Sequence, residues 1–335
     1  MRIYVFTKNW GRNFTGATLA TQYLVARWLQ KGMSVDVFTL NIGEYNQEAN
    51  LQVFQANTIS ELKKLVEKQK QSNTGPIIGY SDDHFGYVLD ELSIPYVHTY
   101  HGNWPDAKHA NVEMWMKSFY FMPLYKKTIT AARFVVNVSK YMESFTSRFN
   151  PNSTVIHNGI EIKQCEAGQI THGTYLMVGN VEKRKYGLLP NLAKYLNEKQ
   201  SNIRIDVYGR VLDLRLAKQI KECNNVLLLG EKKDIPYKNY SGLINTSKIE
   251  NLSISVCEAI KNQLPVFCFK VGGLPEVVLE NKTGFLFDCY DIPSMGKGLI
   301  KYSLGEQLPV SSEVLADFDW DIAGDKYISL MMENL

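Results

Sequence analysis

Two glutamates with seven residues between them have the spacing to bind a phosphorylated sugar. Glu250 lies in a polar loop, Asn245 to Asn251, and Glu258 lies in the helix predicted from Ser253 to Lys261. A helix N-terminus presents unpaired backbone N–H groups and a partial positive charge, which suits a phosphate. Glu258, about one turn inside the helix, could accept hydrogen bonds from sugar hydroxyls, while Glu250 stands where a second ring could sit.

The same spacing also fits a structural role. Ser255-Val-Cys-Glu258 has the pattern of a capping box, in which the glutamate satisfies a backbone donor. Glu250 also fits an ordinary solvated loop residue. Spacing alone leaves both alternatives open.

The elements around the two glutamates predict half of a doubly wound α/β domain. A short apolar strand ends near Ile244, and Val266 to Phe269 has the apolar, β-favouring composition of a buried parallel strand. Gly272-Gly273 turns the chain into a short helix, Pro275 to Glu280, before a further strand, Phe285 to Phe287. Ligands of such domains bind where loops leave the carboxyl ends of the strands.

Length and composition predict a globular protein of two domains. The chain has 335 residues, 45% hydrophobic and 21% charged, and a formal charge of +3, too small to indicate nucleic acid. We expect an N-terminal domain over 1–165, a C-terminal domain over 166–315 and a terminal helix over 316–335. The sequence shows neither a membrane span nor a signal peptide, and its five cysteines form no C-x-x-C pair, which predicts a cytoplasmic location.

The first half opens with a predicted strand–helix–strand unit. Arg2 to Thr7 is the first strand, Lys8 to Thr15 a polar loop, and Ala17 to Gln30 an amphipathic helix. We expect the apolar face of that helix to hold Leu19, Tyr23, Ala26 and Leu29. Gly16 either starts the helix or approaches a phosphate. The loop lacks G-x-G-x-x-G, so nothing favours a dinucleotide.

His101 and an acidic pair stand at predicted strand ends. Asp82-Asp83-His84 follows one strand, and His101-Gly102 follows the strand Pro95 to Tyr100. The acidic pair fits a solvated turn or a helix cap better than a metal site. A lone histidine is usually structural, yet a strand's carboxyl end is where ligands gather.

Residues 115–133 mix aromatic and basic side chains. Trp115 and Phe119 are accompanied by Lys126 and Lys127. Such a helix can dock on a membrane surface or an amphiphilic acceptor. It can also pack its aromatics on the sheet and leave its lysines in water. Both alternatives remain open.

The spacing around the glutamates resembles the signature of the retaining glycosyltransferases of family 4, which have the two-domain GT-B fold. The resemblance covers about forty residues: Glu250-x7-Glu258, Ala259, Pro265-Val266, Gly272-Gly273, Glu276-Val277-Val278 and Gly284. It implies two Rossmann-like domains facing each other across a cleft. It further implies that Glu250 lies by the donor sugar and that Glu258 holds the ribose. The family usually has Gly where this chain has Asn251.

The resemblance extends to other loops. It implies catalytic roles for His101, Glu250 and Lys185, and donor-binding roles for the following residues: Gly16, Asn180, Arg184, Gly230, Asn251, Leu252, Ser253 and Glu258. A basic stretch, Glu182-Lys-Arg-Lys185, follows Gly179 and suits a diphosphate. Family members carry Arg where this chain has Asn180, and we expect Arg184 to compensate.

The function implied is a retaining, metal-independent hexosyltransferase of bacterial surface polysaccharide or glycoconjugate assembly. It needs no cofactor beyond its nucleotide-sugar donor, a UDP-sugar rather than a GDP-sugar. Its acceptor would be a saccharide or lipid-linked oligosaccharide, with possible membrane contact through 115–133 at the inner face of the cell membrane. The substitutions Asn180 and Asn251 keep a non-catalytic sugar- or partner-binding protein open, and a nucleotide-sugar 2-epimerase is a further alternative. Asp317-x-Asp319-x-Asp321 resembles a metal motif but lies outside the predicted sheet, so we expect no metal there.

Overall fold

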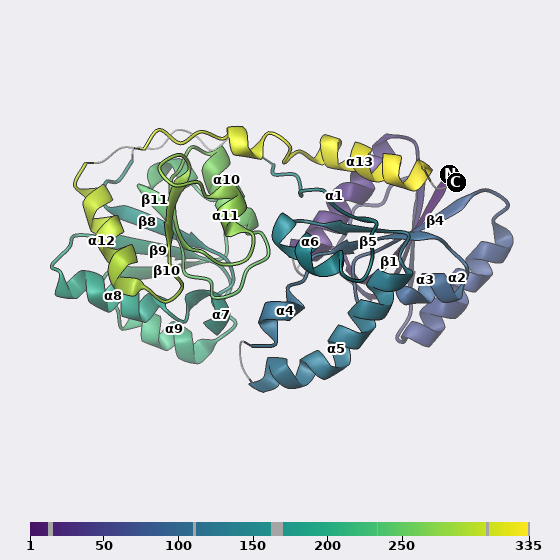
Figure 1. Ribbon diagram of the computed structural model, residues 1–335, viewed down its shortest axis with the longest axis horizontal. Helices are drawn as coiled ribbons and strands as arrows, with labels where there is room; N and C mark the ends of the chain where they lie inside the picture. Colours follow the sequence, from purple (N-terminus) through teal and green to yellow (C-terminus); the bar gives the residue numbers. More distant parts are fainter. Residues whose placement is uncertain (13–15, 110–111, 162–169, 233, 306–307, 334–335) are drawn as a thin grey trace. The chain divides into compact units, whose positions relative to one another are not determined.

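The computed structural model describes residues 1–12, 16–109, 112–161, 170–232, 234–305 and 308–333 (Figure 1). The chain forms two compact units. Unit 1 comprises Met1–Gly159 and Asp317–Leu335, and unit 2 comprises Ile160–Ala316. The domain boundary expected between residues 165 and 166 lies outside the described residues.

Unit 1 is built on a parallel sheet of seven strands in the order β3-β2-β1-β4-β5-β6-β7. The strands are β1 (Arg2–Trp10), β2 (Ser34–Ile42), β3 (Leu51–Gln55), β4 (Ile77–Ser81), β5 (Tyr96–Tyr100), β6 (Phe134–Asn137) and β7 (Ser153–Val155). The helices are α1 (Gly16–Gln30), α2 (Ile59–Ser72), α3 (Tyr87–Glu91), α4 (Trp104–Ala107), α5 (Val112–Ala131), α6 (Lys140–Thr146) and α13 (Trp320–Met332). One apolar cluster joins the sheet to α1 and α13, and another joins it to α2, α3, α5 and α6. Helices therefore cover both faces.

Unit 2 repeats this architecture with a parallel sheet in the order β10-β9-β8-β11-β12-β13. Its strands are β8 (Thr174–Val178), β9 (Arg204–Tyr208), β10 (Val226–Gly230), β11 (Gly242–Asn245), β12 (Val266–Phe269) and β13 (Gly284–Phe287). Its helices are α7 (Lys183–Tyr186), α8 (Leu189–Glu198), α9 (Leu214–Lys221), α10 (Ile254–Lys261), α11 (Leu274–Val277) and α12 (Ile292–Ser303), with 3₁₀ turns η1 (Tyr237–Asn239) and η2 (Glu313–Leu315). All four residues of β12 are buried, as its apolar run predicts. The predicted pair of Rossmann-like domains is confirmed.

Two local predictions in the first strand–helix–strand unit were wrong. β1 continues to Trp10, because Asn9 and Trp10 pair with Asn41 and Ile42 of β2. In α1, Leu29 of the predicted face is buried and Tyr23 packs against the core, but Leu19 is 44% exposed, and Leu24 and Trp28, outside the predicted face, are buried. That helix is apolar on most sides, so its pattern did not identify the face that packs.

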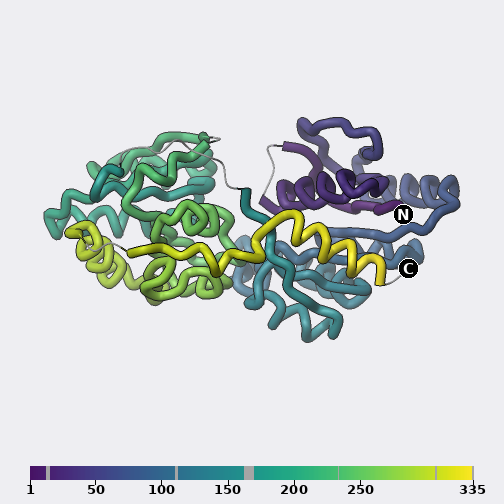
Figure 2. Tube along the Cα trace, turned by 90° about the horizontal axis from the view of Figure 1, so that it is seen from above, coloured from purple at the N-terminus to yellow at the C-terminus, as the bar shows by residue number. Residues whose placement is uncertain are grey.

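The last helix, α13, folds onto unit 1, beside α1 (Figures 1 and 2). Trp320 stacks on Tyr23 of α1 with ring centroids 4.9 Å apart, and Tyr327 hydrogen-bonds to Thr99 of β5 at 2.7 Å. Asp319 caps the helix, since its Oδ1 accepts from the backbone N–H groups of Asp321 and Ile322 at 2.7 and 3.1 Å. The D-x-D-x-D run thus contains a helix cap.

Candidate active site

In unit 2 a lysine and a glutamate from two different loops lie together at the carboxyl edge of the sheet. Lys185 belongs to α7, which follows β8, and Glu250 belongs to the loop after β11. Lys185 Nζ lies 3.9 Å from Glu250 Oε2, and the two side chains are 24% and 10% exposed. This distance gives electrostatic attraction without a hydrogen bond. The lysine therefore keeps donor capacity for an anion that approaches the edge.

Backbone contacts fix this pair in place. The Lys248 N–H donates to the Arg184 carbonyl at 3.0 Å, and the Thr246 hydroxyl donates to the Lys185 carbonyl at 2.7 Å. These two bonds tie the α7 turn to the loop between β11 and α10. Thr246 has no motif that would have pointed to this role.

Arg184 lies in the same turn but has other partners. Its guanidinium pairs with Glu182 at 2.8 Å and reaches the Ile249 carbonyl at 3.4 Å. Asn180, which follows Gly179 at the end of β8, is exposed. The expectation that Arg184 compensates for Asn180 therefore remains a prediction, and it competes with the Glu182 ion pair.

Glycines bring the glutamate loop against its neighbour. A Cβ on Gly272 would lie 1.8 Å from the Glu250 carbonyl oxygen, and Gly272 has a φ of +55°. The Gly273 N–H donates to the Asn251 carbonyl at 2.7 Å. Asn251 is buried, and Leu252 is partly buried. The backbones of the two loops approach so closely at the Gly272-Gly273 turn that a side chain at Gly272 would have no room.

The start of α10 lies beside the end of β8. Ser253 is its N-cap residue, and Ser253 Oγ lies 3.0 Å from Ser255 Oγ, which in turn reaches the Val178 carbonyl at 3.4 Å. Lys185, Ser255 and the segment 244–247 line a small hollow here. Ser255, in the first turn of α10, and one lysine border it, a combination that suits a phosphate.

The capping-box alternative for Glu258 was wrong. The N-cap is Ser253 rather than Ser255, so Glu258 lies beyond the third helical position. Glu258 Oε2 instead accepts a hydrogen bond from the Tyr237 hydroxyl at 2.6 Å. Tyr237 stands in a stretch without hydrophobic periodicity, which is why sequence patterns did not find it.

Gly230 ends β10, with a φ of +77°. Its carbonyl accepts from the Gly209 N–H at 2.8 Å, so the ends of β9 and β10 are joined. Arg210 and Glu231, the next residues of the two strands, form an ion pair at 3.1 Å. The loop that follows Gly230, for which the resemblance implies a donor-binding role, therefore begins with a paired charge.

In unit 1, His101 follows β5 at the carboxyl edge. Burial lowers the pKa of His101 to about 4, against the attraction of the Asp83 carboxylate. Burial, and then His101, lowers the pKa of His98 to about 3. His98 Nδ1 lies 2.9 Å from Ser81 Oγ. Both imidazoles are therefore neutral at neutral pH. Gly16, the first residue of α1, is exposed.

Asp82 is a half-buried acid at the same edge. Its Oδ2 accepts from the Thr21 hydroxyl at 2.6 Å. Burial raises the pKa of Asp82 to about 7, and the charge of Asp83 adds to this rise, although the Thr21 hydroxyl opposes it. Asp83 contacts the backbone N–H and the ring of His84. Within the described ranges, no three His, Cys, Asp or Glu side chains are grouped as metal ligands.

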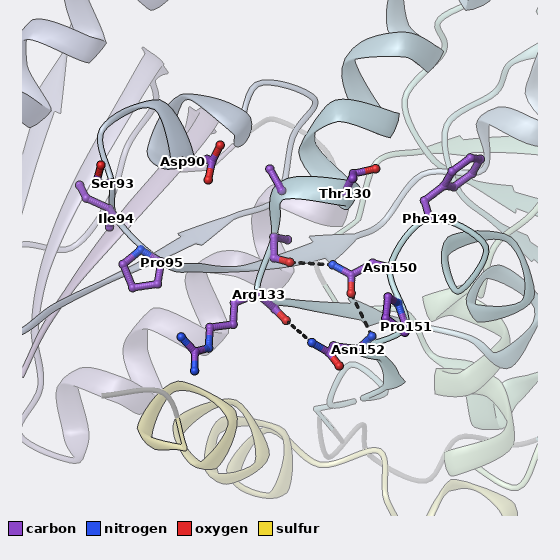
Figure 3. Close-up of a pocket in the computed structure, with 12 residues that line it drawn as sticks. Asp90, Ser93, Ile94, Pro95, Thr130, Arg133, Phe149, Asn150, Pro151 and Asn152 are labelled. Atoms are coloured by element: carbon purple, nitrogen blue, oxygen red, sulfur yellow. Dashed lines mark hydrogen bonds between the residues drawn. The ribbon is translucent and has the colours of Figure 1, made fainter.

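A cavity of about 590 Å³ lies at the other end of the unit 1 sheet (Figure 3). Its walls include Pro95, Arg133 and Asn152, each just before a strand, so it lies at the amino ends of β5, β6 and β7. Asn150 donates to the carbonyls of Ile129 and Ala132 at 2.8 and 2.6 Å. Because ligands of doubly wound sheets bind at the carboxyl ends, we do not assign this cavity to the site.

The two halves of helix α5 differ in what their side chains contact. Towards its C-terminus Tyr125 packs edge-on against Tyr100, and Lys127 pairs with Glu91 at 2.8 Å. Towards its N-terminus Trp115 and Phe119 are 52% and 66% exposed, so they do not pack on the sheet. None of the helices in the described part of the chain has the length and apolar character needed to cross a bilayer.

Two family models match the chain. Residues 167–311 match glycosyl transferases group 1, and residues 80–164 match glycosyltransferase family 4. No curated protein sequence is similar to the chain.

Solved structures share the fold over nearly the whole chain. The lipopolysaccharide outer core galactosyltransferase WaaB superposes with a TM-score of 0.75 at 13% identity, covering 100% of both chains. HepE from Anabaena, in complex with UDP and glucose, has a TM-score of 0.72 at 16% identity, covering 99% of each. Sucrose-phosphate synthase from Thermosynechococcus elongatus has a TM-score of 0.72 at 16% identity, covering 98% of this chain and 94% of the other. The two family models and this shared fold support a glycosyltransferase of GT-B type.

Proposed function

We propose that the protein is a retaining, metal-independent glycosyltransferase that moves a sugar from a UDP-sugar to a saccharide hydroxyl. The observation that carries the proposal is the Lys185–Glu250 pair, held by Thr246 and Lys248 beside the N-terminus of α10. Lys185 and the first N–H groups of α10 would bind the diphosphate. Glu250 would bind the sugar, and Glu258 the ribose.

In the proposed reaction the bond between the sugar C1 and the diphosphate oxygen breaks, and the acceptor oxygen attaches to C1 from the same face. The acceptor proton passes to the departing β-phosphate. The negative charge grows on the diphosphate, so stabilisation of that anion accounts for most of the catalysis. Lys185 would stabilise this charge, and the neutral His101 would offer a hydrogen bond to a sugar hydroxyl without adding charge.

Two of the similar solved structures support the choice of a UDP-sugar donor and of a surface polysaccharide as the product. The HepE structure contains UDP and glucose, and WaaB is a lipopolysaccharide galactosyltransferase. A UDP-hexose donor and a surface polysaccharide acceptor follow by analogy. The acceptor would be a saccharide or a lipid-linked oligosaccharide.

Thermal-shift screening with UDP-, GDP- and ADP-sugars tests the donor. A ligand at a hundred times its dissociation constant stabilises the fold by about 2.7 kcal/mol, which is a clear shift in melting temperature. NMR of the product then gives the anomeric configuration. Inverted configuration would contradict retention, binding without transfer or hydrolysis would indicate a binding protein, and free sugar inverted at C2 would indicate an epimerase.

We further propose that α5 docks the enzyme on the membrane that carries a lipid-linked acceptor. Large apolar side chains recur at helical spacing and face solvent, all more than half exposed: Val112, Trp115, Met116, Phe119 and Tyr120. They present on the order of 500 Å² of apolar surface, less than the roughly 800 Å² per partner that stable protein interfaces bury. Aromatic residues on one helix face are typical of insertion at a lipid interface.

The structure changes how this docking should respond to salt. Lys127 is paired with Glu91, and its Nζ lies 3.9 Å from the Tyr87 ring centroid, while Lys126 Nζ lies 5.2 Å from that of Phe149. Apolar insertion should therefore dominate over attraction between lysines and lipid.

Co-sedimentation with anionic and neutral vesicles at low and high salt tests the docking. We expect binding that weakens little with salt. Trp115→Ala with Phe119→Ala should abolish it, whereas Leu214→Ala, at an even more exposed apolar site in unit 2, should not. No binding to either vesicle at low salt would contradict membrane docking and leave the donor chemistry untouched.

A further inference from the structure

One buried hydroxyl of unit 2 touches the glutamate proposed to hold the ribose. Tyr237 lies in η1, between β10 and β11, and is 6% exposed. Its hydroxyl donates to Glu258 Oε2 at 2.6 Å. Hydrogen bonds from a hydroxyl to a carboxylate are short and strong, and this distance lies in their range. The contact joins two elements that are separate in the chain, η1 and α10.

The turn that carries Tyr237 is itself anchored. The Tyr240 N–H donates to the Tyr237 carbonyl at 3.2 Å. The Tyr240 hydroxyl lies 2.9 Å from that of Tyr208 on β9 and reaches Asp206 Oδ2 at 3.1 Å. The position of the Tyr237 ring is thus set by the sheet, which makes its hydroxyl a fixed reference point for the Glu258 side chain.

We propose that Tyr237 is a positioning residue that orients the Glu258 carboxylate toward the ribose, an inference that rests on the proposed function. A carboxylate has about four lone-pair sites, and the tyrosine occupies one of them. A glutamate in the middle of a helix otherwise samples several rotamers, and fixing one before the ligand arrives lowers the cost of binding. The carboxylate then accepts hydrogen bonds from ribose hydroxyls.

This arrangement makes Tyr237 a determinant of sugar specificity in the nucleotide. Because an ionised carboxylate only accepts hydrogen bonds, its ligands must be donors, and a deoxyribose lacks one of them. A nucleotide that lacks this ribose hydroxyl leaves the fixed Glu258 carboxylate without one hydrogen bond, and it therefore binds more weakly. Without the Tyr237 hydroxyl the carboxylate loses this hydrogen bond and is held less firmly, and the difference between the two nucleotides should shrink.

Isothermal titration with two ligand pairs tests this. The pairs are UDP with 2′-deoxy-UDP and GDP with 2′-deoxy-GDP. We expect the unmodified chain to prefer the ribose form by about tenfold, the value of one hydrogen bond to a charged group. Tyr237→Phe keeps the ring and should reduce this preference to about threefold or less, with only the small fall in melting temperature that the loss of one hydrogen bond causes. In a Glu258→Gln background, Tyr237→Phe should have no further effect.

Tyr175→Phe is the matched control, because it removes a buried hydroxyl of unit 2 that donates to the Leu299 carbonyl at 3.0 Å and has no part in holding Tyr237. It should lower the melting temperature and leave the ribose preference intact. A preference unchanged in Tyr237→Phe, or absent from the unmodified chain, would overturn the inference while nucleotide binding itself stands. If the unmodified chain binds neither UDP nor GDP, the proposed function falls and this inference with it.

Discussion

At the carboxyl edge of the unit 1 sheet, titratable groups are shielded from water in ways that favour their neutral forms, whereas the edge of unit 2 holds charges in pairs. Burial lowers the pKa of His101 to about 4 and raises that of Asp82 to about 7. In unit 2, by contrast, Lys185 faces Glu250 and Arg210 faces Glu231, with side chains that water partly reaches. Two sheets of one topology therefore end in opposite electrostatic environments.

The difference indicates which ligand each edge can accept. A charged ligand at the unit 1 edge would need compensation that neutral imidazoles do not give, so hydroxyl groups suit it better. At the unit 2 edge, Lys185 can exchange its weak contact with Glu250 for a phosphate. The following predictions test this contrast.

Lys185→Ala should have the largest effect. Losing a hydrogen bond to a charged group costs roughly 1.5–3 kcal/mol, or about ten- to a hundredfold in affinity for UDP, because the diphosphate loses its cation. Titration calorimetry measures this. Lys183→Ala removes an exposed lysine of the same turn and should change the affinity less than threefold. Equal losses in both variants would reduce the role of Lys185 to general surface charge.

Glu258→Ala should follow, with about a tenfold loss of UDP affinity from missing ribose hydrogen bonds. Because the N-cap of α10 is Ser253, no helix cap is lost, and any fall in melting temperature should come from the missing Tyr237 hydrogen bond. Affinity titration and a melting curve on the same variant decide the matter. A loss of about 1 kcal/mol in stability with unchanged affinity would instead indicate a structural role.

Asp82→Asn should alter the pH dependence of stability. The folded-state pKa of Asp82 lies above its unfolded value, so its contribution is fully present below about pH 4 and is lost as the pH rises through 7. Relative to the variant, the unmodified protein should therefore lose stability between pH 5 and 8. Melting curves across this range measure the difference, and parallel curves would show that Asp82 is ionised in the fold.

Arg184→Ala should have the smallest effect. Its ion pair with Glu182 is exposed, and such pairs contribute about 0–1 kcal/mol. We expect UDP affinity to fall threefold or less, because the guanidinium already has partners. A tenfold loss would show that Arg184 leaves Glu182 for the diphosphate and replaces the arginine missing at Asn180.

Sequence patterns located most of the candidate site, because the loops after β8, β11 and β12 carry marked local chemistry. Glycine pairs, an acidic spacing and a basic run can each be recognised without knowing the fold. The patterns failed where an element is apolar all round, as in α1, or where a hydrophobic face has no partner within its own unit, as around Trp115. In both cases periodicity does not tell which neighbour a side chain meets.

The order of strands, polar loops and helices, and hence the two Rossmann-like domains, was determined by the sequence itself, since hydrophobic period and turn residues act over a few positions. Only the tertiary structure decided the pairing of Tyr237 with Glu258, of Lys185 with Glu250 and of Arg184 with Glu182. The first two of these contacts join residues far apart in the chain. In the third, the partner of Arg184 depends on which groups the neighbouring loops bring within reach of its guanidinium. A carboxylate accepts from whichever donor the fold brings within about 3 Å, and that distance is set by the packing of whole elements.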